Sequence, residues 1–319
     1  MDRAAPPPPA APPDHGGGID AAARRWGGAR GDWLDLSTGI NPVPYPLPAL
    51  PPDAWTALPD HAATEALEAA ARAFWRVPPE AAMLVAPGAS ALIARIPCLA
   101  RAGRVAIPGP TYNEHARAFA AAGWRVTDGG AAGAMVAVHP NNPDGRTWRE
   151  SDLAAPLTVI DESFCDATPD ASLIALAARP GTLVLKSFGK FWGLAGLRLG
   201  FAIGDPALAA RLAALLGPWP VSGPALAVGA AALRDEGWAG AARARLAADA
   251  ARLDALVPAP CLGGTTLFRL YRVDDAAAWQ ARLARHRIWS RVFPYDPTWL
   301  RLGLPGTGAG WDRLARALA

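Results

Sequence analysis

From Met83 onward, short apolar runs alternate with alanine-rich stretches long enough to form helices. This order of strand, helix and strand is typical of an α/β domain with a largely parallel sheet. We expect ligands at the carboxyl ends of its strands, where open α/β sheets bind them. The predicted strands are Met83–Ala86, Arg104–Ile107, Trp124–Thr127, Ala134–Val138, Leu157–Ile160, Thr182–Lys186 and Leu199–Ile203, and the predicted helices are Ser90–Ala100, Glu114–Ala122 and Ser172–Ala178.

A different pattern follows the last of these strands. Pro206–Leu216 and Pro224–Leu256 are predicted helices, and the second is long enough to bridge two domains. A small α+β domain is predicted from Thr265–Tyr271, Ala276–Arg285, Ile288–Phe293, Leu300–Leu302 and Gly310–Leu318. We therefore expect a disordered Pro/Ala-rich tail (1–14), a segment that joins the small domain (15–47), a large domain (48–217), and a bridging helix with the small domain (218–319).

Composition excludes several classes of protein. The chain has 31 basic and 28 acidic residues and no run of lysine or arginine, which argues against a nucleic-acid partner. It has no apolar stretch near the ~18 residues that a membrane span requires, so we expect no membrane association. Its three cysteines are widely spaced and form no metal-ligand pattern, which suits a metal-free protein in the reducing cytoplasm.

Lysine is rare in this chain, since only Lys186 and Lys190 are present. Lys190 follows a predicted buried strand and precedes a glycine-spaced loop that leads to Arg198. A lysine forms a Schiff base only when its amine is neutral, and burial beside other cations lowers its pKa toward that state. Arg198 and Ser187 could then hold a phosphate. The alternative for this motif alone is a surface lysine beside a glycine-rich turn.

Other chemically useful residues also lie where predicted strands end. Asp161 could keep the ring nitrogen of a pyridine cofactor protonated, and Asn142 could donate to its ring oxygen. The Pro87–Ser90 turn offers backbone amides to a phosphate, and Tyr112 could stack on the ring. Taken singly, each has a plainer interpretation as a cap, a turn or a core residue.

Together and in this order, these segments resemble the fold-type I pyridoxal-phosphate enzymes, the superfamily of the class I/II and histidinol-phosphate aminotransferases. The resemblance runs from about His15 to the C-terminus. It implies the α/β fold of that superfamily with a smaller α+β domain, a pyridoxal 5'-phosphate cofactor and a homodimer. It makes Lys190 and Asp161 the catalytic residues, and it implies a cofactor site of Gly88, Ala89, Ser90, Tyr112, Asn142, Asp161, Ser187, Lys190 and Arg198.

The N-terminal part narrows the resemblance. His15-Gly-Gly-Gly18 and the later Ser37-Thr-Gly-Ile-Asn-Pro42 are similar to the opening of the L-threonine-O-3-phosphate decarboxylases of cobalamin biosynthesis. This implies a carboxy-lyase that converts L-threonine O-3-phosphate to (R)-1-amino-2-propanol O-2-phosphate. A phosphorylated amino acid carries two anionic groups, so its site needs at least two cations besides the one that holds the cofactor. The implied substrate residues are His15, Gly39, Asn142, Arg291 and Arg301.

The chain departs from these relatives at three positions. Gly18 stands where the decarboxylases have asparagine, and Gly189 where the aminotransferases have serine or threonine before the lysine. Leu58 lies where many relatives have a tyrosine that reaches the phosphate of the neighbouring subunit. We expect the last two changes to weaken the contacts to phosphate without altering the chemistry.

Residue identities alone leave the reaction open. The cofactor labilises whichever bond to Cα stands perpendicular to its ring, so the outcome depends on an angle that no sequence gives. An aminotransferase of the histidinol-phosphate type and a catalytically silent cofactor-binding protein therefore remain alternatives.

Overall fold

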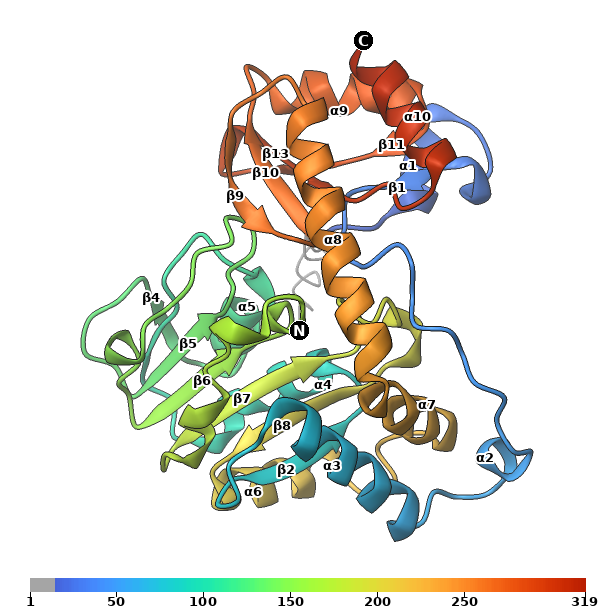
Figure 1. Ribbon diagram of the computed structural model, residues 1–319. Helices are drawn as coiled ribbons and strands as arrows, with labels where there is room; N and C mark the ends of the chain where they lie inside the picture. Colours follow the sequence, from blue (N-terminus) through green and yellow to red (C-terminus); the bar gives the residue numbers. More distant parts are fainter. Residues whose placement is uncertain (1–14) are drawn as a thin grey trace, which may run out of the picture.

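The computed structural model describes residues 15–319, so the predicted tail at 1–14 lies outside the described residues. A large domain lies below a smaller one, and the long helix α8 (Glu236–Leu256) runs between them (Figure 1). Among the described residues, no helix is both long and apolar enough to cross a membrane.

The large domain is built on a seven-stranded sheet of order β2-β8-β7-β6-β5-β3-β4. Only β8 runs against its neighbours, which confirms the predicted, largely parallel sheet. All seven predicted strands are confirmed to within one residue at each end. They are β2 (Ala82–Ala86), β3 (Arg104–Ala106), β4 (Arg125–Thr127), β5 (Ala134–Val138), β6 (Leu157–Asp161), β7 (Thr182–Ser187) and β8 (Gly200–Gly204).

Helices cover both faces of this sheet. Ile160 and Val184 point to one face, where they join a core with Leu67 of α3 (His61–Trp75). Their neighbours along the strands point to the other face and pack with α4 (Ala89–Ile93), α5 (Asn113–Ala121) and α6 (Pro206–Leu216). Since both faces are buried, central strands such as β5 and β8 are apolar throughout rather than alternating, and this is why they stand out in the sequence.

Two predicted long helices are wrong as single elements. Ser90–Ala100 is α4 (Ala89–Ile93) followed by a 3-10 turn, since Pro97 lacks an amide donor and cannot continue an α-helix. Pro224–Leu256 is interrupted at Asp235, whose side chain accepts from Trp238 N and caps α8; the first part is α7 (Gly223–Arg234).

The remaining helical segments of the large domain are short. The helix predicted at Ser172–Ala178 is instead the 3-10 segment Ile174–Ala178, and Ser172, whose hydroxyl donates to Glu162, lies before it. The other 3-10 segments are Ile96–Leu99, Glu150–Asp152, Cys165–Ala167, Pro169–Ala171 and Ala195–Leu197.

The small domain is a four-stranded antiparallel sheet of order β12-β13-β10-β9, with α9 (Ala276–Arg285) and α10 (Gly308–Leu318) against it. The predicted segment Thr265–Tyr271 contains the end of β9 and most of β10. The chain turns there between β9 (Cys261–Thr265) and β10 (Phe268–Arg272), and Leu267 N donates to Thr265 Oγ1 at 3.1 Å. The other strands are β11 (Ile288–Trp289), β12 (Arg291–Phe293) and β13 (Asp296–Gly303).

The N-terminal part of the described chain belongs spatially to the small domain. It contains α1 (Ile19–Trp26), a 3-10 turn (Arg30–Asp32) and β1 (Leu34–Asp35), which pairs with β11. Residues 36–52, here called the linking segment, then descend to α2 (Asp53–Thr56) beside the large domain (Figure 1). The domains are therefore joined by both the linking segment and α8.

Candidate active site

The strand ends open into two adjoining cavities between the domains. The lower one is lined by Ser90, Asp161, Ser187 and Arg198 of the large domain. The upper one is lined by residues of both domains, among them His15, Gly39, Arg291 and Arg301. Tyr112, Asn142, Phe164 and Lys190 line both cavities, so the site residues implied by the sequence gather around one connected space.

The amine of Lys190 lies at the junction of the two cavities. Burial, the charge of Arg301 and, more weakly, that of Arg198 lower its pKa to about 8, although Asp161 opposes the shift. Its Nζ also lies 5.4 Å from the centre of the Phe164 ring. Lys190 is therefore close to the neutral state that a nucleophilic amine needs.

Asp161 ends β6 and is 2% exposed. Burial alone would raise the pKa of Asp161. A hydrogen bond from His115, the charge of His115 and two hydrogen bonds from Ser163 outweigh burial and lower it. His115 Nε2 lies 2.8 Å from Asp161 Oδ2, and since a carboxylate only accepts, the proton belongs to Nε2. His115 was not among the site residues expected from the sequence. Only its position about one helical turn after Tyr112 could have indicated that it lies near the site.

Arg198 lies where a phosphate group could be bound. The backbone of Arg198 lies in the left-handed region at φ 52°, and Arg198 Nη1 donates to Ala195 O at 3.0 Å. Gly88 has φ 85°, a conformation that favours glycine, and a Cβ there would also lie 2.8 Å from Arg198 Nη2 near the start of α4. Ala89, Ser90 and Ser187 line the same cavity.

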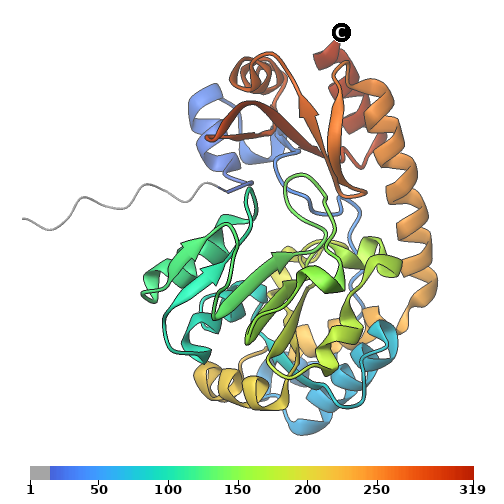
Figure 2. The same cartoon turned by 90° about the vertical axis from the view of Figure 1, so that its left-hand side faces the viewer.

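Asn142 and Tyr112 face this cavity from neighbouring loops. The side-chain oxygen of Asn142 accepts from Arg301 Nη1, which leaves its amide N–H groups for another partner. Burial, then the charges of Asp161 and Glu114, raise the pKa of Tyr112 to about 12, so its hydroxyl stays protonated at neutral pH. The loop that carries Asn142 meets the small domain, where Gly264 N donates to Asp144 O at 2.8 Å; Figure 2 shows this loop, after β5, below the small domain.

Arg291 and Arg301 stand directly opposite each other on β12 and β13. Side chains at paired positions share one face of a sheet, so their like charges repel. Burial and the charge of Arg291 lower the pKa of Arg301 to about 9. Arg301 Nη2 donates to Ser37 O at 2.6 Å, while its buried Nε has no hydrogen-bond partner among the described residues. An anion placed here would relieve the repulsion and supply that partner.

His15 and Gly39 close the upper cavity. His15 Nε2 lies 3.0 Å from Glu114 Oε1, and its ring centre is 5.8 Å from that of Tyr112. Gly39 is confined by packing, because a Cβ there would lie 2.7 Å from Phe268 and 2.9 Å from Phe164. A glycine is therefore needed where the linking segment passes the cavity.

Lys186, the second lysine, does not line either cavity. Its Nζ lies 2.6 Å from Glu162 Oε2 and 3.3 Å from Asp166 Oδ1, on the far side of the sheet end. Burial lowers its pKa, but these two carboxylates outweigh burial and raise it. Lys186 thus stays charged and supports the fold, whereas Lys190 loses its proton at a much lower pH.

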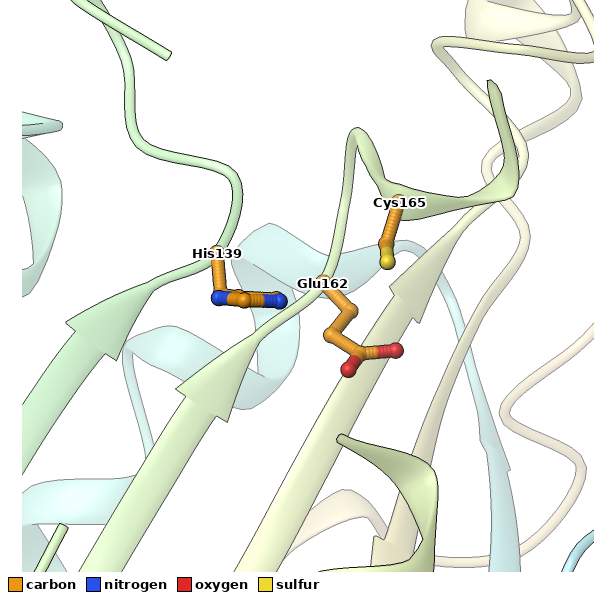
Figure 3. Close-up of side chains that lie close together, drawn as sticks. All are labelled: His139, Glu162 and Cys165. Atoms are coloured by element: carbon orange, nitrogen blue, oxygen red, sulfur yellow. The ribbon is translucent and has the colours of Figure 1, made fainter. Parts of the chain in front are cut away.

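A separate group of potential metal ligands lines neither cavity. His139, Glu162 and Cys165 approach within 4.8 Å of one another (Figure 3). His139 Nδ1 accepts from Trp148 N at 3.0 Å, so the ring proton is on Nε2, which lies 2.6 Å from Ala171 O. Glu162 is already bound to Lys186. Both ring nitrogens and the carboxylate are occupied, so this cluster supports the fold rather than a metal ion.

The three departures from the relatives also have structural settings. Gly18 begins α1 at φ 76°, a conformation that asparagine also tolerates. Leu58 is 68% exposed and far from both cavities, two residues before Asp60 caps α3. A Cβ on Gly189 would make ordinary contacts at 3.4 Å or more, so serine would fit there.

Comparison with known proteins identifies the family of the chain. The class I and II aminotransferase family matches residues 126–318. A threonine-phosphate decarboxylase of a Sinorhizobium species is 44% identical over 94% of this chain and 96% of its own length. The Pseudomonas aeruginosa threonine-phosphate decarboxylase is 43% identical over 93% and 94%, respectively.

Solved structures agree in fold. The histidinol-phosphate aminotransferase of Sinorhizobium meliloti, solved with pyridoxal 5'-phosphate, has a TM-score of 0.77 over 94% of this chain and 93% of its own, at 19% identity. That likeness confirms the predicted fold class. Given the sequence identity along almost the whole chain, this protein belongs to the threonine-phosphate decarboxylase family, within the class I and II aminotransferases.

Proposed function

We propose that this enzyme removes the α-carboxylate of L-threonine O-3-phosphate as CO2, leaving (R)-1-amino-2-propanol O-2-phosphate for cobalamin biosynthesis. The observation that carries the proposal is the 44% identity to a threonine-phosphate decarboxylase over nearly the whole chain. Pyridoxal 5'-phosphate, when bound, supplies the electron sink for cleavage of the bond to Cα.

The lower cavity fits that cofactor by its chemistry. Lys190 Nζ would bind the aldehyde carbon, and the ionised Asp161 would keep the ring nitrogen protonated. Asn142 would donate to the ring oxygen, and Tyr112 would stack on the ring. Arg198, Ser187, Gly88, Ala89 and Ser90 would hold the phosphate.

The upper cavity fits the two anionic ends of the substrate. Arg301 binds the carboxylate through its unpartnered Nε, and Arg291, opposite it on β12, binds the side-chain phosphate. His15, Gly39 and Asn142 line the same space, with His15 as a further phosphate contact. Neutralising two facing guanidinium groups favours a substrate with two separate anions.

We also propose a homodimer. Trp55, Leu58 and Trp219 are at least 58% exposed, and Leu58 and Trp219 border an apolar groove together with Leu216 and Val221. Exposed apolar surface of this kind is typical of an interaction site. Sedimentation velocity should give twice the 33.1 kDa chain mass, and Trp219→Ser should shift the protein toward single chains. A wild-type protein of single-chain mass would contradict the dimer.

Product analysis tests the reaction. Holoenzyme given phosphothreonine should release CO2 and the phosphorylated amine in equal amounts, at a rate that does not depend on an added 2-oxo acid. An aminotransferase would instead make a 2-oxo acid and require the acceptor. Cofactor binding without any product would favour a silent binding protein.

The pH dependence of cofactor attachment tests the lowered pKa of Lys190. Only the neutral amine attacks the aldehyde, so the attachment rate of apoprotein should rise with pH and level off above about 8. Nα-acetyl-lysine under the same conditions is the reference, because the pKa of its side-chain amine is near the ordinary value of ~10.4. Arg301→Gln removes a nearby positive charge and should move the curve to higher pH. A protein curve that coincides with the reference would contradict the assignment.

Two arginine variants test which arginine binds the carboxylate of the substrate and which binds its phosphate. A hydrogen bond to a charged group contributes about 1.5–3 kcal/mol, or roughly 10- to 150-fold in binding. Arg291→Ala should therefore weaken phosphothreonine by this factor relative to unphosphorylated threonine, whereas Arg301→Ala should weaken both alike. Inhibition constants for the two amino acids make the comparison internal. Equal losses in Arg291→Ala would assign the phosphate to another residue, with His15 next.

A further inference from the structure

Asn41, in the linking segment, is bonded directly to the main chain that carries Lys190. The residue is 2% exposed. Its backbone N donates to Lys190 O at 2.9 Å, and its side-chain Nδ2 donates to Phe191 O at 2.8 Å. Two consecutive carbonyls of the lysine loop are thus bound by one residue that lies about 150 positions earlier in the chain.

The orientation of the Asn41 amide is fixed by its other neighbours. Its Oδ1 accepts from Val43 N at 3.0 Å and from Arg245 Nη2 at 2.9 Å. Both partners are donors, so the oxygen must face them and the NH2 group must face Phe191 O. Arg245 lies on α8 and is paired with Asp249 at 3.6 Å, so the helix between the domains holds this amide in place.

The same segment also holds Arg301. Ser37 O accepts from Arg301 Nη2 at 2.6 Å, and Gly303 N donates to Leu36 O at 2.7 Å. Between these anchors and Asn41, Gly39 passes so close to the rings of Phe164 and Phe268 that a Cβ there would clash with both. A short, tightly packed piece of chain therefore connects the arginine on β13 to the loop of Lys190.

We infer that Asn41 is a positioning residue that fixes the backbone of Lys190 relative to Arg301. The inference rests on the proposed role of Lys190 as the lysine that binds the cofactor. A reacting group must be held within about 0.5 Å of its productive position, and supporting hydrogen bonds provide this. Loosening the two carbonyls would misplace the amine while leaving the walls of the cavity intact.

The test compares two cofactor forms on the apoprotein. Pyridoxal phosphate binds through Lys190, whereas pyridoxamine phosphate has no aldehyde and binds without that covalent bond. In Asn41→Asp, the oxygens still accept from Val43 N and Arg245, but the donor to Phe191 O is replaced by a repelling carboxylate. We expect Asn41→Asp to weaken pyridoxal phosphate binding by about tenfold or more, with pyridoxamine phosphate changed less than about twofold.

Asn41→Ala should follow the same pattern, and Arg245→Met should show a smaller change in the same direction. The matched control is Arg72→Met, which also removes a side-chain donor to a backbone carbonyl (Ala81 O, 2.9 Å) but lies in α3, outside both cavities, and should alter neither affinity.

Equal losses of affinity for the two cofactor forms in Asn41→Asp would mean that Asn41 only supports the fold. Unchanged affinities would mean that Asn41 has no role in positioning Lys190. Either result overturns the inference. Failure of the proposed function looks different, because the wild-type protein itself would then not attach pyridoxal phosphate covalently.

Discussion

We infer that the site depends on lowering the pKa of one buried lysine amine, that of Lys190. The positive charges of Arg301 and Arg198 act with burial to bring the pKa of Lys190 to about 8, while Asp161 restrains the shift. The same two guanidinium groups remain as anchors for anions, so the arrangement that activates the amine also attracts phosphate and carboxylate. The Asp161 carboxylate stays ionised because His115 and Ser163 supply hydrogen bonds that burial would otherwise leave unmade.

Sequence was sufficient for the parts of the fold that follow from local pattern. Strands such as β5 and β6 are buried on both faces, so each is a continuous apolar run. Once they are recognised as strands of a parallel sheet, the residues that follow them must share one edge. Asp161, Asn142 and Lys190 do line one cavity.

Sequence was insufficient where a side chain from elsewhere decides the outcome. The sequence of β9 is rich in glycine and therefore not typical of a strand. The segment is a strand because it pairs with β10, which lies later in the chain. The break at Asp235 depends on a cap that a helical pattern does not reveal. His115 and Asn41 meet Asp161 and Lys190 only through tertiary packing, so neither could be assigned a role from spacing. The sequence pointed to Arg291 and Arg301, but only their pairing across β12 and β13 shows that they face each other.

We propose that Lys190, and not Lys186, carries the cofactor. The two lysines differ in environment: Lys186 is bound to Glu162 and Asp166 and remains charged, whereas Lys190 faces the cavity. Borohydride reduction of the holoenzyme followed by peptide mapping distinguishes them directly. We expect the pyridoxyl group on the peptide that contains Lys190, with Lys186 unmodified. A pyridoxyl group on Lys186, or on no lysine, would contradict it.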